Sequence, residues 1–223
     1  MSHNYQAIIF DMDGVLWYSS AAHEKAFDFA CRTFNLPPLG YYAAYAGMST
    51  SGVFKKHLAL HGITPEDEFV EQVVRCKQKT ARELLIETAP LHPKLDNILR
   101  RLVEKYSLAL ASSGSAESVS LFFSLSKTAD YFCAVVSKDD VTKSKPAPDI
   151  FLRAAQLLRV KPAEALVVED SINGVRAARA GNMNVLGIGT DVAELMKAGA
   201  IKCLPNIDYL IDWLLGEEND SRT

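Results

Sequence analysis

The chain has 223 residues, enough for one sizeable core or for a core with a smaller second lobe. Its formal net charge of −3 and its lack of any basic run argue against a nucleic-acid partner, and no apolar stretch approaches the roughly 18 residues of a membrane span. Four widely spaced cysteines and the absence of a secretion signal favour reduced thiols in a cytoplasmic protein.

The first predicted element is a buried strand, "AIIF" at 7–10, which runs directly into Asp11 and Asp13. Isolated buried carboxylates are costly, and two of them repel each other. Asp-x-Asp-Gly is also good turn chemistry, so the pair alone could be a simple turn. If the strand is buried, a cation or a basic side chain has to offset both charges.

Residues 18–88 contain no convincing strand. Helices are expected at about 20–35, 51–61 and 65–87, the last with Thr64 as its N-cap and Pro65 in its first position. We interpret 18–88 as a helical, lid-like cap domain inserted after the first strand. The core would then consist of 1–17 and 89–223, with the two prolines of "APLHPKL" at the hinge.

Short, continuous apolar runs then alternate with helical stretches. The predicted strands lie at 107–111, 132–136, 165–168, 184–189 and 201–204, and the predicted helices lie in "PKLDNILRRLVEKY", "APDIFLRAAQLL" and "SINGVRAARAG". Continuous apolar runs are typical of strands buried on both faces of a parallel sheet. The expected fold class is therefore α/β, with a doubly wound (Rossmann-like) parallel sheet and the small α-helical cap.

Polar side chains follow four of these strands. They are Asp11 and Asp13, then Ser112, Ser113, Gly114 and Ser115, then Lys145 after a loop, and finally Glu169 and Asp170. Ligands of an open parallel sheet bind beyond the carboxyl ends of its strands, so these groups should meet at one edge. Each group has a simpler explanation alone, as a turn, a helix cap or an exposed lysine, and Lys138 and Lys143 compete with Lys145.

Together these residue types suit phosphoryl transfer. Four carboxylates without His or Cys favour Mg²⁺, which binds through a few carboxylates and substrate phosphate. The serines and the backbone N–H groups near Gly114 would cradle a phosphate, and Lys145 would offset its charge. One aspartate can attack phosphorus while a second carboxylate moves the proton.

The four motifs resemble those of the haloacid dehalogenase-like superfamily, in the same order. "FDMDGVL", "LALASSGS", "SKPAPDIF" and "VVEDSING" are similar to its nucleophile, phosphate-binding, lysine and acidic motifs. The resemblance implies Asp11 as nucleophile, Asp13 as acid/base, Ser112 as phosphate-binding hydroxyl and Lys145 as the positive charge. It also implies Mg²⁺ on Asp11, on the backbone carbonyl of Asp13 and on Asp170, with Glu169 supporting the site from behind.

The branch resembled most is that of β-phosphoglucomutase and phosphoglycolate phosphatase, in which a cap loop contacts substrate. "GMST" makes Gly47 and Thr50 candidates for that contact. His23 could meet the substrate or its leaving group, although an exposed histidine is the more common finding. The mutases of this branch typically carry an arginine after Gly-x-Ser, where this chain has Thr50, and this difference weakens the mutase interpretation.

The sequence thus favours a Mg²⁺-dependent phosphatase acting on a small phosphorylated metabolite through an aspartyl-phosphate, as a monomer or weak homodimer. A β-phosphoglucomutase-like sugar-phosphate mutase is the main alternative. A non-catalytic phospho-receiver or phosphate-binding protein is a remote one, because receiver domains lack the Asp-x-Asp pair and the inserted cap.

Overall fold

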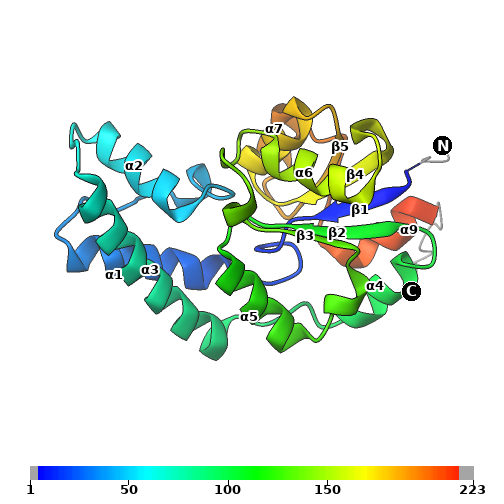
Figure 1. Ribbon diagram of the computed structural model, residues 1–223, viewed down its shortest axis with the longest axis horizontal. Coiled ribbons are helices and arrows are strands. Elements are labelled where there is room, and N and C mark those ends of the chain that lie inside the picture. Colours follow the sequence, from blue (N-terminus) through cyan, green and yellow to red (C-terminus); the bar gives the residue numbers. More distant parts are fainter. Residues whose placement is uncertain (1–4, 216–223) are drawn as a thin grey trace.

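The computed structural model describes residues 5–215, which form a parallel sheet covered by helices on both faces, with three further helices at one end (Figure 1). Six strands lie in this part of the chain, in the spatial order β3-β2-β1-β4-β5-β6. Their bounds are β1 Ala7–Phe10, β2 Ser107–Ala111, β3 Ala134–Val136, β4 Ala165–Glu169, β5 Asn184–Ile188 and β6 Lys202–Leu204. The first strand lies at the centre, where the order of the strands changes direction, so the expected doubly wound α/β fold is confirmed.

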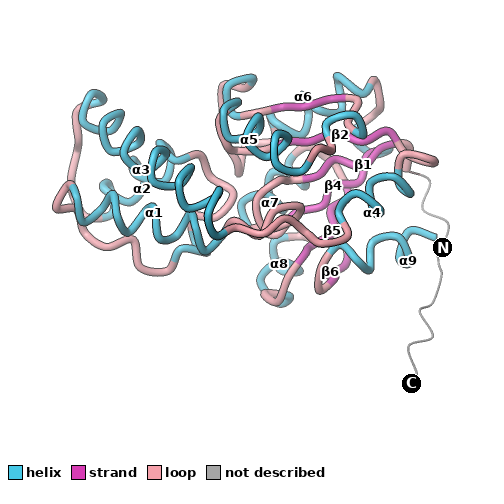
Figure 2. The backbone as a smooth tube through the Cα atoms, turned by 90° about the horizontal axis from the view of Figure 1, so that it is seen from below, coloured by secondary structure: helices cyan, strands magenta, loops and turns pink. Residues whose placement is uncertain are grey.

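The central strand supplies both layers of the core, because neighbouring side chains of a strand point to opposite faces. Ile8 and Phe10 belong to one apolar cluster, and Ala7 and Ile9 belong to the other. The first cluster lies under α4 (Leu95–Leu102), α5 (Ala116–Ser126) and α9 (Leu210–Leu215), and the second lies under α6 (Asp149–Leu158), α7 (Ile172–Ala180) and α8 (Val192–Ala198). Figure 2 shows these helices on both sides of the strands.

The inserted helices lie beside the sheet, at the left of Figure 1. They are α1 (Ser20–Thr33), α2 (Thr50–Leu60) and α3 (Asp67–Thr88). These helices have an apolar cluster of their own, which includes Phe27, Phe54 and Val73. We call residues 18–88 the cap; its definition as a separate domain with these bounds stays a prediction. Short 3₁₀ turns occur at Tyr42–Ala44, Ala129–Tyr131, Lys138–Asp140, Pro162–Glu164 and Ile207–Tyr209.

The last helix of the cap begins later than expected. Its N-cap is Glu66 and its first residue is Asp67, so the assignment of Thr64 as N-cap was wrong. Glu66 has an extended backbone conformation, which keeps Pro65 outside the helix. In contrast, Ser171 caps α7, because its hydroxyl accepts a hydrogen bond from the Gly174 N–H at 3.0 Å.

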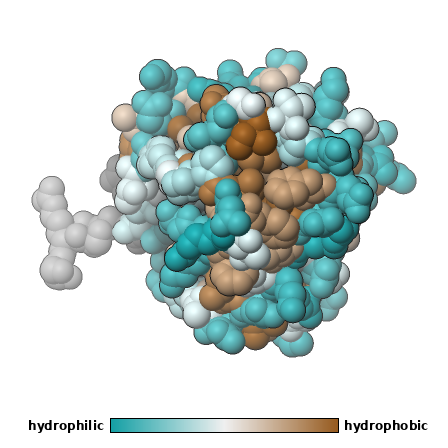
Figure 3. All heavy atoms as spheres, turned by 90° about the vertical axis from the view of Figure 1, so that its left-hand side faces the viewer, coloured by the Kyte–Doolittle hydropathy of each residue, from teal (hydrophilic) through white to brown (hydrophobic). Residues whose placement is uncertain are grey.

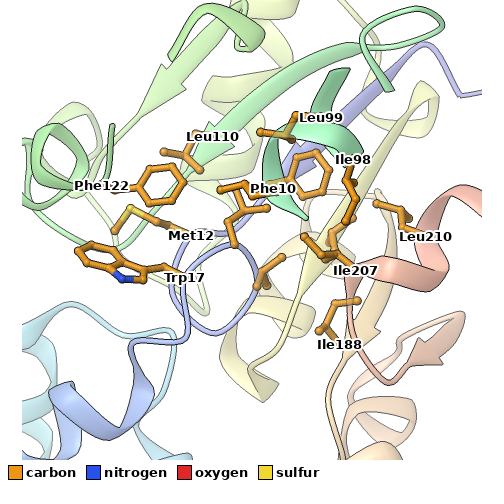
Figure 4. Packing of buried hydrophobic residues seen from close by; sticks show 14 of the residues in the cluster. Phe10, Met12, Trp17, Ile98, Leu99, Leu110, Phe122, Ile188, Ile207 and Leu210 are labelled. Carbon is orange, nitrogen blue, oxygen red and sulfur yellow. The ribbon is translucent and has the colours of Figure 1, made fainter. Parts of the chain in front are cut away.

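Two linkers connect the cap to the core, and they lie side by side. The Trp17 indole N–H donates to the Ala89 carbonyl at 2.9 Å, and the Tyr18 N–H donates to the Pro90 carbonyl at 3.1 Å. The Trp17 ring is fully buried, with its centroid 5.9 Å from that of Phe122 (Figure 4). The entry and the exit of the cap are therefore anchored on the same part of the core.

Figure 3 faces the cap end and shows apolar side chains gathered near the middle of that face, among charged ones. Exposed apolar side chains of the cap include Phe29, Leu60 and Ile63. The expected monomer or weak homodimer stays a prediction. No helix within residues 5–215 has the length and apolar character needed to cross a membrane.

Candidate active site

The sheet brings the predicted residues together through the order of its strands. Asp11 follows β1, Ser112 follows β2, and Glu169 ends β4, and these three strands are neighbours. The Asp11 N–H donates to the Val168 carbonyl of β4 at 2.9 Å, so the strand pairing extends up to the carboxylate. Parallel strands present their carboxyl ends at one edge, which explains why residues far apart in sequence converge there.

Lys145 lies fully buried between two carboxylates. Its ammonium donates to Asp11 Oδ1 at 2.5 Å and to Glu169 Oε1 at 2.7 Å. Burial alone would lower the pKa of Lys145, but Asp11 and Glu169 more than offset this effect and raise it. Lys145 is therefore a fixed positive charge beside Asp11, whereas the competing Lys138 lies elsewhere, on the wall of a neighbouring cavity.

Glu169 is positioned by contacts on both of its oxygens. One oxygen accepts from Lys145, and the other accepts from the Ser171 N–H at 2.6 Å. A Cβ on Gly174 would lie 1.6 Å from Glu169 Oε1, so only glycine leaves room for the carboxylate at this point of α7. The contacts of Glu169 show a side chain that orients Lys145; its predicted support of a metal stays a prediction.

Negative charge exceeds positive charge around Asp11. Burial raises the pKa of Asp11 to about 8 despite the opposing effect of Lys145, and Glu169 and Asp13 add to the rise. Burial raises the pKa of Asp170 well above its usual value, with further increases from Glu169 and Asp11. One lysine does not neutralise this group, so a further cation would stabilise the ionised carboxylates.

The donor set fits Mg²⁺. Within the described residues no group of three or more His, Cys, Asp or Glu side chains could hold a metal ion. Asp11 and Asp170 line the same small cavity, and their role as metal ligands together with the Asp13 carbonyl stays a prediction. Mg²⁺ typically binds through one or two carboxylates, with water and substrate phosphate completing its shell. A Cβ on Gly14, which has φ +80°, would lie 1.8 Å from Asp170 Oδ2. Glycine thus lets the Asp170 carboxylate approach the loop after β1.

Asp13 points toward the cap. Ser19 and His23 contact it directly, and Lys77 contacts His23. The Ser19 hydroxyl donates to Asp13 Oδ1 at 2.6 Å, and His23 Nε2 lies 3.1 Å from the same oxygen. Lys77 Nζ of α3 lies 2.9 Å from His23 Nδ1. Because an ammonium can only donate, Nδ1 accepts this bond and the ring proton is assigned to Nε2, which donates to Asp13.

These contacts favour the carboxylate form of Asp13. Burial would raise the pKa of Asp13, but His23, Ser19 and Lys77 outweigh it, so the pKa is lowered. Burial and Lys77 lower the pKa of His23, which agrees with a neutral imidazole. Burial also lowers the pKa of Lys77 to about 8. The chain of contacts Asp13–His23–Lys77 links the loop after β1 to two cap helices.

Two cavities meet at Asp13. The smaller, of about 70 Å³, is lined by Asp11 and Asp170, and the larger, of about 330 Å³, extends between α3 and α5. Both include Asp13, His23, Thr50, Lys77, Ser113 and Gly114. The smaller one has the carboxylates expected around a phosphoryl group, and the larger one has room for the rest of a small molecule.

The cap loop before α2 is hydrogen-bonded to the core. The Ser113 hydroxyl donates to the Gly47 carbonyl at 2.7 Å, and the Asn173 amide donates to the Ala46 carbonyl at 2.8 Å. Gly47 has φ +78°, and a Cβ there would lie 2.2 Å from Ser171 Oγ. These contacts hold the loop directly over the ends of the strands.

All predicted site residues therefore lie in one region, in different positions. Gly47, Thr50, His23, Ser113 and Gly114 line the cavities. Ser112 is fully buried beneath them, where its hydroxyl accepts from the Gly114 N–H at 3.0 Å. His23 is not the exposed histidine considered above, since its side chain is only 13% accessible.

The sequence-based prediction missed Lys77, Ser19, Tyr42 and Asn173. Lys77 had left a detectable pattern, because it stands between Val73 and Ala81 in the buried stripe of α3, where an apolar residue is expected. Tyr42 lines the smaller cavity, whereas the aromatic residues of a cap loop are more commonly expected to pack against the cap helices. Ser19 and Asn173 had no comparable pattern, because their roles depend on how the cap packs on the core.

Comparison with known proteins identifies the family of the chain. Residues 5–182 match the haloacid dehalogenase-like hydrolase family. The chain belongs to this family. Its relatives include fructose-1-phosphate phosphatase YqaB of Escherichia coli, 27% identical over 84% of this chain and 98% of that protein. They also include β-phosphoglucomutase of Bacillus subtilis, 28% identical over 82% and 83% of the two chains.

A solved structure extends the agreement to the fold. A hydrolase from Pseudomonas syringae superposes with a TM-score of 0.85 at 27% identity, covering 93% of this chain and 97% of that one. The resemblance stated from the motifs is thus confirmed, and so is the predicted enzyme class, a phosphoric monoester hydrolase of the haloacid dehalogenase-like family.

Proposed function

We propose that this haloacid dehalogenase-like enzyme is a Mg²⁺-dependent phosphatase that hydrolyses a small phosphorylated metabolite in the cytoplasm. The observation that carries the proposal is the pair Asp11 and Asp13: Asp11 lies in a small carboxylate-lined cavity, and Asp13 lies where that cavity meets a larger one. The four cysteines are all free, as is typical of a reducing compartment.

The reaction divides into two steps. Asp11 attacks phosphorus, the bond from phosphorus to the ester oxygen breaks, and Asp13, which must enter this step protonated, gives its proton to the departing oxygen. Water then attacks the aspartyl-phosphate while Asp13 takes its proton, which releases phosphate and restores Asp11. Lys145 and the backbone near Gly114 offset the charge on the phosphoryl oxygens. A magnesium ion held by Asp11, Asp170 and the Asp13 carbonyl would supply further positive charge there.

The contacts of Asp13 suit the second step. Its lowered pKa favours the carboxylate, which is the form that accepts a proton from water. His23 and Ser19 hold that carboxylate in place from the cap side. The mutase alternative requires a sugar hydroxyl to take the place of water. It has support from the similarity to β-phosphoglucomutase, whereas Thr50 stands where those mutases typically carry an arginine.

Replacement of the nucleophile tests the proposal. Asp11→Asn should lose phosphatase activity by at least about 10⁴-fold, because an amide does not attack phosphorus, while the fold measured by circular dichroism stays intact. Asp130→Asn is the matched control, because Asp130 is an exposed aspartate outside the cap and outside the site. Activity retained by folded Asp11→Asn would show that Asp11 is not the nucleophile.

A screen of phosphorylated metabolites separates the alternatives. It should include fructose 1-phosphate and glucose 1-phosphate, with phosphate release and the sugar product both measured. Released phosphate supports the phosphatase, and an isomerised sugar phosphate without phosphate release supports the mutase. Stable phosphate binding without turnover of any ester or of acetyl phosphate would support a non-catalytic phosphate-binding protein.

A further inference from the structure

The leaving group can be assigned to one of the two cavities. Of the two cavities that meet at Asp13, only the smaller one is lined by Asp11 and Asp170, so the phosphoryl group belongs there. Asp13 lines both cavities, and as the acid it must face the oxygen that leaves. The alcohol part of the substrate therefore extends past Asp13 into the larger cavity, between α3 and α5.

The wall of that larger cavity is strongly cationic. Five basic side chains line it, against two carboxylates, Asp13 and Glu117. The basic residues are Arg75, Lys77, Lys79 and Arg82 of α3 and Lys138 of the loop after β3. The whole chain has a formal net charge of −3, so this excess of positive charge is a local property of the cavity.

Most of these basic groups already have a partner. Arg82 pairs with Glu117 at 3.1 Å, and Lys77 is bonded to His23. Arg75 lies 3.4 Å from Glu71, and Lys138 lies 3.6 Å from Asp139, but neither of these two acids lines the cavity. Lys79 has no ion-pair or hydrogen-bond partner within residues 5–215. The wall therefore retains positive charge toward the cavity.

The basic side chains of this wall only donate hydrogen bonds, and such bonds are stronger to an anionic group than to the neutral hydroxyls of a sugar. An anionic group would use this wall fully. We propose, on the basis of the phosphatase function above, that the preferred substrate carries a second anionic group on its alcohol part, a carboxylate or a second phosphate. Lys79 and Lys138 are the residues that recognise it.

Matched pairs of substrates test this specificity. Phosphoglycolate is compared with 2-hydroxyethyl phosphate, and fructose 1,6-bisphosphate with fructose 1-phosphate. At least one anionic member should exceed its neutral counterpart about tenfold in kcat/KM, and this ratio should fall as salt rises from 50 mM to 500 mM, since partly exposed charges are screened. The first pair reports on a carboxylate and the second on a phosphate.

Two variants identify the residues. Lys79→Gln and Lys138→Gln should each lower that ratio about fivefold, as expected for one partly exposed charge pair. Lys202→Gln, an exposed lysine of β6 far along the sheet, should leave the ratio unchanged.

Failure of the proposed substrate specificity can be distinguished from failure of the proposed phosphatase function. Turnover of these esters with a ratio near one in both pairs, or a ratio that neither variant lowers, overturns the second anionic group and leaves the phosphatase in place. No turnover of any ester, with acetyl phosphate also inert, overturns the phosphatase and the inference with it.

Discussion

Lys77 lies in an environment that disfavours its positive charge. Its ammonium is buried in the cap, 4.4 Å from the centre of the Phe27 ring, and its hydrogen bond goes to a neutral histidine. Replacing a buried charged group by an apolar one of similar size often stabilises a protein. The buried charge of Lys77 therefore lowers the free energy of unfolding, while its hydrogen bond positions His23 against Asp13.

The pH dependence of stability should reveal this cost. Burial lowers the pKa of Lys77 to about 8, against about 10.4 in the unfolded chain. Between these values the unfolded state binds more protons, so the free energy of unfolding gains a contribution that rises with pH. Lys77→Met should be more stable than the wild type by about 1–3 kcal/mol at pH 7, and less so at pH 10.

Urea unfolding followed by tryptophan fluorescence at the two pH values measures this difference. Lys79→Met is the control, because Lys79 is exposed on the same helix two residues away. If Lys77→Met and Lys79→Met gave the same change at both pH values, the lowered pKa of Lys77 would be refuted.

At the scale of elements, α7 approaches the site so closely that Gly174, its third residue, affects the position of Lys145 through Glu169. A methyl group on Gly174 would displace Glu169, which in turn holds Lys145 at 2.7 Å. Gly174→Ala should lower kcat at least about tenfold and destabilise the protein by about 1–3 kcal/mol, the usual cost of overpacking.

Gly181→Ala provides the comparison at the other end of the same helix. Gly181 has φ −83°, and its added Cβ would meet nothing closer than 3.3 Å. Steady-state kinetics and urea unfolding of the two variants should therefore differ clearly. Equal, small effects would mean that Glu169 can move without disturbing Lys145.

The first turn of α7 also holds the cap loop. Asn173→Ala removes its hydrogen bonds to the carbonyls of Ala46 and Ala44, and leaves the bond from Ser113 to Gly47. We expect KM to rise several-fold with a smaller change in kcat, because the loop closes less often over the substrate. Amide hydrogen exchange of residues 44–47 should increase.

Asn97→Ala, an exposed asparagine of α4, serves as the matched substitution. Unchanged exchange in the loop of Asn173→Ala would show that the Ser113 contact is sufficient to hold it.

The elements also show what could be predicted from the sequence. The sheet could be predicted because β1, β4 and β5 are short apolar runs, and a topological rule then placed Asp11, Ser112 and Glu169 at one edge. The start of α3 could not be predicted, because Pro65 is compatible both with the first turn of a helix and with an extended segment before it. The extended backbone at Glu66 shows that the helix begins after this segment. The partners of Asp13 lie on α1 and α3, and only the packing of the cap brings them together.

At the scale of the whole molecule, metal binding should connect activity and stability. Asp11 and Asp170 repel each other in the folded state, and a bound cation relieves that repulsion. EDTA should abolish activity, excess Mg²⁺ should restore it, and Mg²⁺ at about a hundred times its Kd should raise the free energy of unfolding by about 2.7 kcal/mol.

Thermal unfolding with and without Mg²⁺ measures the shift. In Asp170→Asn the shift should largely disappear, whereas the Asp130→Asn control should keep it. Full activity in excess EDTA would exclude the metal from the mechanism.

If the cap is a separate domain, as predicted, the paired linkers at Trp17 and Ala89 would make it a replaceable module. Because the chain leaves and re-enters the core at adjoining points, joined by hydrogen bonds of 2.9 and 3.1 Å, a tight turn could connect these points and leave every strand in place. Exchange of the inserted segment would then alter which molecules reach Asp11 without redesign of the sheet. The same catalytic edge could in this way acquire new substrates through the insertion alone.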